Sequence, residues 1–323
     1  MARTLKIAFI GLGEHQSRAH LKHLLTLAAS GYALDFVGAF DPSPAAFIDL
    51  QTNFGLELKS FASANELLAH PGLDAVFISS PDQFHTEQLQ QAVLQGLHVF
   101  CEKPISVTED DAALLTAILY KAGEKGLVVS SCHPRRFDPP FMALKAQLPA
   151  LVEQWGPLKH FDFSFWYHEV TDAWKKDRSL LSDHFGHEID LVRFLFGANK
   201  LKAEKMADGY EFYEVQGLAD AGITFRFMGS RALAESVYHE SVRLDFAKGA
   251  LFFNLNEGFG IELPSGNRFD FHAIDYDARF LAVNKNFLDT ILGTAENYLS
   301  HDDLLANNLS SVSLTERGCY YPS

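Results

Sequence analysis

Cysteine is scarce in this chain of 323 residues, which contains only Cys101, Cys132 and Cys319. They lie far apart and form no CxxC pair, so the sequence predicts neither a zinc ribbon nor a disulfide framework. Long apolar runs are missing as well, because no stretch approaches the roughly 18 residues that a membrane-spanning helix needs. The amino-terminal apolar run leads straight into a glycine turn, without the features of a secretory signal peptide. We therefore expect a cytoplasmic protein that does not bind a membrane.

Basic residues are few relative to acidic ones: 27 Lys and Arg stand against 41 Asp and Glu, for a formal net charge of −14. A surface this negative repels phosphate backbones and anionic lipids, and no run of Lys and Arg creates a local exception. The sequence therefore argues against nucleic acid as a partner and favours a small-molecule substrate. The hydrophobic fraction of 47% is that of an ordinary globular protein, and the length favours two domains.

Short apolar runs alternate with helical patterns over residues 1–132. The runs are rich in β-branched and aromatic residues and read KIAFIGLG, LDFVGAF, DAVFISS, HVFCEKP and GLVVSSC. Strands that alternate with helices predict crossover connections and a parallel sheet. We therefore expect an α/β dinucleotide-binding domain here.

The pattern changes from residue 133, where the turn-rich HPRRFDPP precedes a helical stretch, FMALKAQLPALVEQ. Longer segments with alternating polarity follow, among them KHFDFSFWYHEV, AGITFRFMG and ALFFNLNEG. This alternation predicts a mainly antiparallel sheet with one solvated or ligand-facing side. Expected helices at about 183–196, 276–293 and 301–317 complete a second, α+β domain over residues 133–323.

Gly11 and Gly13 lie between a predicted strand and a predicted helix in IAFIGLGEHQSRAH. This is the context of a dinucleotide-binding loop, in which glycine permits a tight turn and close approach of a pyrophosphate to a helix N-terminus. Gln16 takes the third glycine position, so the fingerprint is incomplete, and GLG after a strand is also typical of a simple turn. We expect Leu12 and His15 to line the cofactor site together with the two glycines.

Asp41 ends the second predicted strand, where a carboxylate accepts hydrogen bonds from ribose hydroxyls and repels a 2′-phosphate. No Arg or Lys follows before Lys59, so the sequence favours NAD over NADP. A purely structural role at the start of the DPSP turn is the alternative for this carboxylate.

Polar residues also follow two later strands, at SSPDQFH and CEKP. Ligands bind at the carboxyl ends of parallel strands, so Ser80, Pro81 and His85 are further candidates for cofactor contact.

The stretch SDHFGHEID contains five side chains that can bind a metal or move a proton. On a helix, Asp183 and His187 stand at i and i+4 with Asp190 on the same side, and His184 and Glu188 form a second pair. A metal site would recruit the first aspartate and both histidines, but an HExxH motif is absent and no cysteine lies nearby, so we expect no metal. The alternative to catalysis is a helix cap and interdomain packing.

IGLG, Asp41, SSP with His85, CEKP and the DxxxHxxD pattern of residues 183–190 occur in this order along the chain. Together they resemble the Gfo/Idh/MocA family of glucose–fructose oxidoreductase-like, NAD(P)-dependent dehydrogenases, and the resemblance covers nearly the whole chain. It implies an amino-terminal Rossmann domain and a carboxyl-terminal open sheet that faces cofactor and substrate. It also implies a homodimer or homotetramer.

The resemblance assigns roles to individual residues. Lys103 corresponds to the catalytic lysine of the EKP motif, Glu102 to a neighbour of the nicotinamide ribose, and Pro104 to a residue often preceded by a cis bond. Asp183 and His187 match the downstream catalytic pair.

The resemblance also implies a substrate pocket. Arg136 matches an arginine near the substrate, and His133 sits where a polar residue often lines that pocket. Trp166, Tyr167 and His168 are candidates for a wall that stacks on a pyranose, although aromatic residues in alternating strands are also typical of a core.

The expected reaction is hydride transfer between NAD(H) and a hydroxyl or keto carbon of a sugar, cyclitol or sugar derivative. His187 would move the hydroxyl proton, and Asp183 or another carboxylate would orient the imidazole. Lys103 would stabilise the alkoxide or act as the base itself. Two alternatives stay open: a reductase of non-sugar substrates, as in the dihydrodiol and biliverdin branches, and a non-catalytic NAD-binding sensor.

Overall fold

The chain forms two compact units in a computed structural model, which describes residues 3–167, 179–197, 201–209, 211–231, 239–262 and 268–320. The first unit comprises Met1–Pro134 and Tyr276–Leu309, and the second comprises Arg135–Asp275 and Ser310–Ser323. The expected boundary after residue 132 thus lies two residues before the structural one. The structure also differs from the expected division because a late segment returns to the first unit, where its helix packs on the first sheet.

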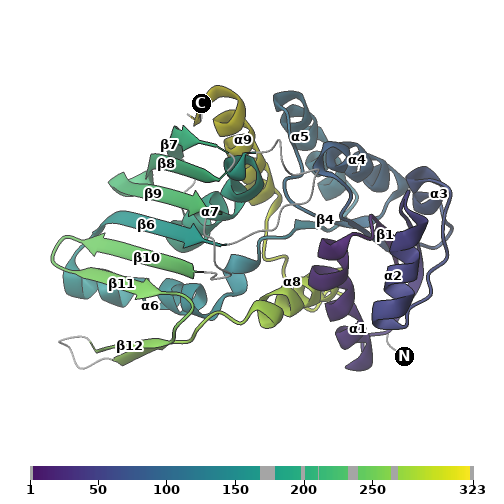
Figure 1. Cartoon of the computed structure of the whole chain (residues 1–323), viewed down its shortest axis with the longest axis horizontal. Coiled ribbons are helices and arrows are strands. Elements are labelled where there is room, and N and C mark those ends of the chain that lie inside the picture. The colour runs from purple at the N-terminus through teal and green to yellow at the C-terminus, as the bar shows by residue number, and fades with distance from the viewer. Residues whose placement is uncertain are drawn as a thin grey trace. The chain divides into compact units, whose positions relative to one another are not determined.

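The first unit contains a five-stranded parallel sheet in the order β2-β1-β3-β4-β5 (Figure 1). Four of the strands lie within the runs identified in the sequence, and β1 begins one residue before its run. The strands are β1 (Leu5–Ile10), β2 (Leu34–Phe40), β3 (Ala75–Ile78), β4 (His98–Cys101) and β5 (Val129–Ser131). The predicted parallel sheet with alternating helices is therefore confirmed.

Helices cover both faces of this sheet. They are α1 (Lys22–Ala29), α2 (Pro44–Phe54), α3 (Ala64–Leu68), α4 (His85–Gln95), α5 (Glu109–Glu124), α8 (Tyr276–Ile291) and the first part of α9 (His301–Arg317). On one face Phe77 and Phe100 stack with ring centroids 5.2 Å apart, and Phe287 of α8 lies 5.4 Å from each of them. This aromatic contact is the reason that the late helix belongs to the first unit. The opposite face packs aliphatic side chains of β3 and β4 against α4 and α5.

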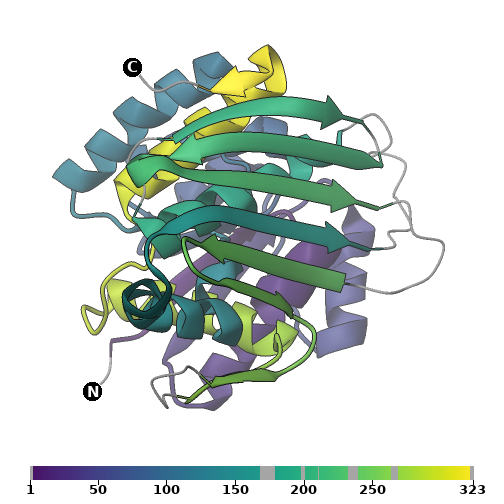
Figure 2. The same ribbon diagram turned by 90° about the vertical axis from the view of Figure 1, so that its left-hand side faces the viewer.

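The second unit contains a seven-stranded sheet in the order β11-β10-β6-β9-β8-β7-β14, whose strands run side by side in Figure 2. Only the β6–β9 pair is parallel among these strands, so the mainly antiparallel sheet is confirmed. The strands are β6 (Leu158–Trp166), β7 (Leu201–Asp208), β8 (Phe212–Ala219), β9 (Ile223–Ser230), β10 (His239–Phe246), β11 (Ala250–Asn254) and β14 (Cys319–Tyr320). A separate ribbon pairs β12 (Phe259–Glu262) with β13 (Arg268–Phe271).

Helices α6 (Pro139–Trp155) and α7 (Leu180–Phe196) complete the second unit. The helix predicted from residue 183 begins three residues earlier, because the side chain of Ser179 caps it by accepting a hydrogen bond from the backbone N–H of Ser182. Buried phenylalanines are frequent in the core, among them Phe161, Phe163 and Phe227.

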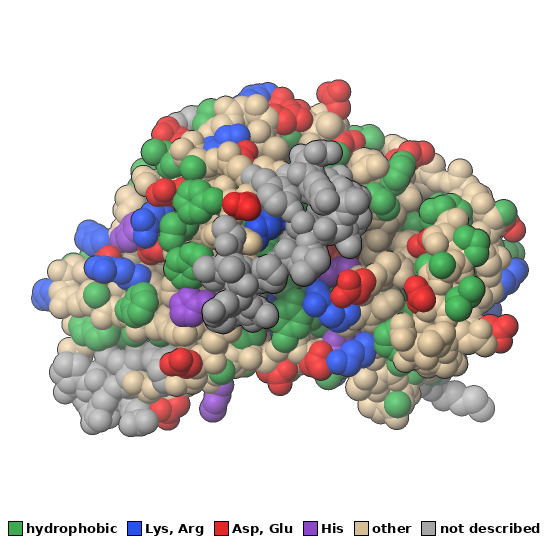
Figure 3. Space-filling view, viewed as in Figure 1, with side chains coloured by type: hydrophobic (Ala, Val, Ile, Leu, Met, Phe, Trp, Pro, Cys, Tyr) green, Lys and Arg blue, Asp and Glu red, His purple; other side chains and the backbone are tan. Residues whose placement is uncertain are grey.

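No helix of the described ranges is both long and apolar enough to cross a membrane. On the side of the molecule drawn in Figure 3, acidic and basic side chains are interspersed.

Candidate active site

The glycine turn after β1 has the tight geometry that the fingerprint predicts. Gly11 adopts a φ of +83°, and a Cβ atom at this position would lie 2.6 Å from the backbone oxygen of Ser79. A Cβ on Gly13 would meet no atom of the described ranges within 4 Å, so the second glycine borders open space there. A helix begins at residue 14, and the backbone N–H of Ser17 donates to the carbonyl of Gly13. The turn therefore offers an open backbone surface beside a helix N-terminus.

Gln16 fills the position of the missing third glycine. It is 1% exposed, and its Oε1 accepts a hydrogen bond from Ser79 Oγ at 2.5 Å. The helix accommodates this side chain in a π-helical stretch, Gln16–Leu21. Among the residues that the structure describes, none forms a hydrogen bond with the buried Nε2 of Gln16. A donor that is buried without a partner at this turn fits a ligand that brings acceptor oxygens, as a pyrophosphate does.

Asp41 holds the glycine turn and can still accept ligand hydrogen bonds. Its Oδ2 accepts from the backbone N–H of Leu12 and its Oδ1 from that of Ser43, each at 2.8 Å. Each carboxylate oxygen retains a further lone pair for a ribose hydroxyl, and the residue is half-buried rather than sealed. Both the structural and the ligand-binding roles considered for Asp41 are therefore compatible with its geometry.

His85 joins two loops that follow neighbouring strands. Its Nδ1 lies 2.8 Å from the carbonyl oxygen of Pro104, and its Nε2 lies 2.7 Å from that of Ser80. The hydroxyl of Ser80 donates to Gln88, and the Lys103–Pro104 peptide bond is cis, as the resemblance implies. Both ring nitrogens of His85 thus hold backbone in place, so the structure gives this residue a positioning role. Direct contact of Ser80, Pro81 and His85 with the cofactor stays a prediction.

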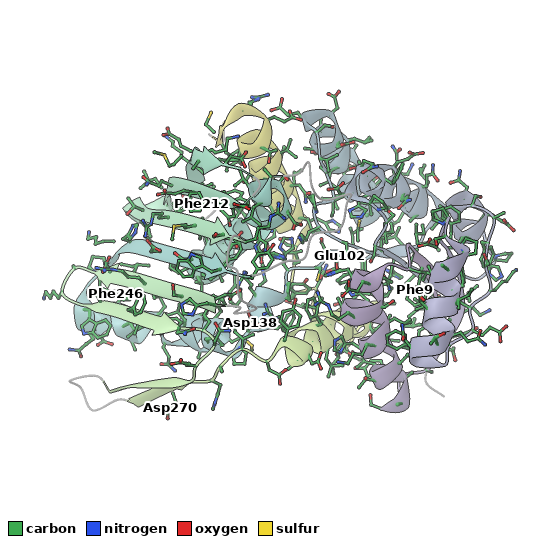
Figure 4. The ribbon with its side chains drawn as sticks, in the orientation of Figure 1. Phe9, Glu102, Asp138, Phe212, Phe246 and Asp270 are labelled. Atoms are coloured by element: carbon green, nitrogen blue, oxygen red, sulfur yellow. The ribbon has the colours of Figure 1, made fainter. Side chains whose placement is uncertain are left out.

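Glu102 lies at the carboxyl end of β4, buried among side chains of the first unit (Figure 4). Its Oε1 lies 2.6 Å from Nε2 of His20 and 3.0 Å from Nε2 of His15, while its Oε2 accepts from the backbone N–H of Lys103 at 3.1 Å. Burial alone would raise the pKa of Glu102, but the charges and hydrogen bonds of the two histidines outweigh it and hold the pKa well below its usual range. The carboxylate is therefore ionised at neutral pH.

Four possible metal donors come together around this carboxylate, namely His15, His20, Glu102 and Cys132, whose donor atoms lie within 4.8 Å of one another. The two contacts of Glu102 Oε1 with the imidazoles have the lengths of hydrogen bonds, so we describe each of them as a hydrogen bond. Burial and the charge of Glu102 raise the pKa of the Cys132 thiol well above its usual range, which keeps it protonated. We describe the group as a hydrogen-bonded cluster and assign no metal to it.

The predicted catalytic pair lies on α7 of the second unit, whereas Lys103 belongs to the first unit. Asp183 is in the first turn of the helix, and both Asp183 and His187 are half-buried. The His187 ring lies 5.6 Å from that of His184, which stacks on Phe165 at 4.0 Å. The side of α7 that carries these residues thus presents polar side chains next to aromatic rings.

The second i, i+4 pair on α7 belongs to a buried ionic network. His184 Nδ1 lies 3.4 Å from Oε1 of Glu188, and that oxygen lies 3.7 Å from the guanidinium of Arg135. Arg135 also contacts Glu240 at 2.7 Å. These contacts give Glu188 a structural role, which the sequence left unassigned.

The residues predicted for the substrate pocket are more enclosed than expected. Arg136 donates to both carboxylate oxygens of Asp190, at 2.7 to 3.1 Å, and only 9% of its side chain is exposed. His133 is buried, and its backbone N–H donates to Tyr298. Trp166 ends β6, with its ring 5.3 Å from that of His239. Their contact with substrate stays a prediction, and His168 lies outside the described residues.

Arg136→Met is expected to destabilise the protein by about 3–5 kcal/mol, because it removes the bidentate cationic partner of the buried Asp190 carboxylate. The double variant Arg136→Met/Asp190→Leu should recover most of this loss, since it removes both charges. Urea unfolding of the two variants measures the effect. Unchanged unfolding with weakened substrate binding would instead assign Arg136 to the substrate pocket.

Known proteins share both the first domain and the whole fold. The model of an oxidoreductase family with an NAD-binding Rossmann fold, GFO_IDH_MocA, matches residues 5–131. An inositol 2-dehydrogenase from Ralstonia nicotianae is 27% identical over 80% of this chain and 70% of its own length. A 1,5-anhydro-D-fructose reductase from Ensifer adhaerens is 27% identical over 62% of this chain and 60% of its own.

A solved structure shows the same architecture in full. Scyllo-inositol dehydrogenase from Lactobacillus casei, with bound NAD(H) and scyllo-inositol, superposes with a TM-score of 0.77 and 20% identity, over 99% of each chain. At that identity the likeness shows the fold alone. The family match and the relatives confirm the resemblance drawn from the sequence motifs: residues 5–131 match the NAD-binding Rossmann fold of the GFO_IDH_MocA oxidoreductases, and the solved structure shares the fold of the whole chain.

Proposed function

We propose that the protein is an NAD-dependent dehydrogenase that oxidises a CH–OH group of a cyclitol or sugar, or reduces the corresponding ketone. The observation that carries the proposal lies at the end of β4. There the Glu102–Lys103 pair is tied by hydrogen bonds to the helix that follows the glycine turn. These contacts support a site in which Glu102 binds ribose hydroxyls, Lys103 binds the substrate oxygen and the glycine turn binds the pyrophosphate.

When bound, NAD supplies the hydride acceptor, and the residues of this chain supply binding and proton transfer. Gly11, Gly13 and the N–H groups at the helix N-terminus would hold the pyrophosphate, and Asp41 the adenosine ribose. The Lys103 ammonium would donate a hydrogen bond to the substrate oxygen and stabilise negative charge on it.

Proton transfer is assigned to α7. We propose that the His187 imidazole takes the hydroxyl proton in the oxidation and returns it in the reduction, with Asp183 orienting the ring. Both residues are accessible enough to meet a substrate, being half-buried rather than sealed in the core.

The substrate class follows from the relatives. Inositol 2-dehydrogenase and 1,5-anhydro-D-fructose reductase are named for polyhydroxylated rings. We propose a substrate of the same class, and a homodimer or homotetramer in the cytoplasm as the sequence predicts.

Asp41→Asn is expected to weaken NAD binding about 10- to 100-fold, because a hydrogen bond to a charged group contributes roughly 1.5–3 kcal/mol. The amide keeps one acceptor oxygen but removes the charge that repels a 2′-phosphate, so NADP affinity should rise towards that of NAD. Calorimetric titration with each nucleotide tests this.

Asp35→Asn, an exposed carboxylate on the same strand, is the matched control and should bind both nucleotides as the unchanged protein does. Equal preference for NAD in the Asp41 variant and the control would show that the adenosine ribose is bound elsewhere.

A further inference from the structure

We propose that His20, fixed in place by Asn284, is a positioning residue that keeps Glu102 ionised and aimed for its ligand. That Glu102 binds a ligand rests on the proposed function. The protonation of His20 follows from contacts within the protein alone. No sequence motif marks either residue, and they lie 264 positions apart.

The two hydrogen bonds that Asn284 donates fix the orientation of its side-chain amide. This residue of α8 is fully buried, and its Nδ2 donates to the backbone oxygens of Ala19 at 2.8 Å and Phe280 at 2.7 Å. Both partners can only accept, so the amide cannot be turned the other way. Its Oδ1 therefore faces Nδ1 of His20, at 3.0 Å, as an acceptor. His20 must carry a proton on Nδ1.

The other ring nitrogen of His20 also carries a proton. Its Nε2 lies 2.6 Å from Oε1 of Glu102, and an ionised carboxylate only accepts. An imidazole that donates through both nitrogens is a cation, so a buried imidazolium and a buried carboxylate balance each other. The short contact is that of a charge-assisted hydrogen bond.

The surroundings of the pair leave few other counter-charges. His20 is 0% exposed and packs edge-on against Phe100, with ring centroids 4.8 Å apart. The titratable and charged groups near the pair, on its own elements and on those packed around it, are His15, His23, Cys101, Lys103, Cys132 and Arg279. His15 also contacts the carboxylate, but 43% of its side chain is exposed, so solvent screens it.

The ion pair with His20 determines which hydrogen bonds the Glu102 carboxylate can form. As an anion it accepts hydrogen bonds from ribose hydroxyls, whereas a protonated carboxyl would present a donor and lose its charge. A carboxyl whose pKa is depressed stays ionised down to that lowered pKa, so NAD binding should be constant across neutral and mildly acidic pH. Without the His20 cation, the buried carboxylate keeps only the exposed His15 as an imidazole partner, so the pKa of Glu102 should rise.

Three variants separate positioning from packing. His20→Phe keeps an aromatic ring but offers no donor, while His20→Gln keeps one N–H that can reach the carboxylate. His23→Phe is the matched control, because His23 is buried on the same helical segment and its nearest carboxylate is the exposed Asp277 at 4.0 Å.

NAD affinity is to be measured by calorimetry from about pH 5 to pH 8, the range in which histidine and shifted carboxyls titrate. We expect a flat profile for the unchanged protein and for His23→Phe. His20→Phe should lose about tenfold in affinity towards the acidic end, which corresponds to one unit of pKa, and His20→Gln should fall between them. A flat profile for His20→Phe would overturn the proposal.

A second readout does not depend on the cofactor. In the unliganded protein labelled with ¹⁵N-histidine, His20 should give the NMR signature of a doubly protonated ring at neutral pH, because both ring nitrogens face acceptors. A neutral His20 ring at that pH overturns the inference even if NAD binds. If NAD does not bind but the ring is doubly protonated, the proposed function fails and the buried ion pair stands.

Discussion

Lys103→Met abolishes turnover while NAD still binds: this is the largest effect that we expect. The methionine side chain has similar length but cannot donate a hydrogen bond to the substrate oxygen or stabilise an alkoxide. Loss of such a group costs about 10²–10⁴-fold in rate. The carboxylate of Glu102 is contacted by His15, His20 and the backbone N–H of residue 103, so the substitution leaves these hydrogen bonds in place.

Initial rates at saturating NAD, together with calorimetric NAD affinity, measure this effect. Lys121→Met, an exposed lysine on α5, is the matched control and should keep full activity. A rate for the Lys103 variant within a few-fold of the unchanged protein would remove Lys103 from the chemistry.

Substitutions of the two turn glycines are expected to fail in different ways. In Gly11→Ala, the new Cβ would lie 2.6 Å from backbone of the β3 loop, and its φ of +83° is strained for any residue with a side chain. We expect a lower urea midpoint and complete loss of NAD binding, because the backbone must shift. In Gly13→Ala the added carbon meets open space, so stability should be unchanged.

NAD affinity of Gly13→Ala is therefore the informative measurement. If the pyrophosphate approaches this backbone closely, the methyl group occupies its space, and affinity should fall by at least about tenfold, or 1.4 kcal/mol. Unchanged affinity in a stable Gly13→Ala protein would mean that the pyrophosphate does not approach this glycine.

Single strands, helices and turns could be predicted from the sequence because each depends on a pattern within a few neighbouring residues. Apolar runs and helical spacing located the five strands of the first sheet, and GLG after a strand located the turn at Gly11. In the second unit β7 and β8 were not identified. In β7 exposed charged residues alternate with small and half-buried ones, so its apolar signal is weak.

The features that sequence could not show depend on contacts between distant segments. The return of α8 to the first unit depends on Phe287 packing between two strands, and the fixed orientation of His20 depends on Asn284. Arg136 illustrates a different limit. Its motif pointed to the substrate, but the motif gave no sign of the bidentate contact with Asp190.

The central claim is tested most directly by incubating the purified protein with NAD and a panel of inositols, pyranoses and sugar acids, and following the near-ultraviolet absorbance of NADH. Absorbance should rise with at least one cyclitol or sugar, and Lys103→Met should abolish the rise. If NAD binds but no substrate of the panel is oxidised, and no corresponding ketone is reduced by NADH, the account of a sugar or cyclitol dehydrogenase is contradicted and a cofactor sensor or non-sugar reductase takes its place.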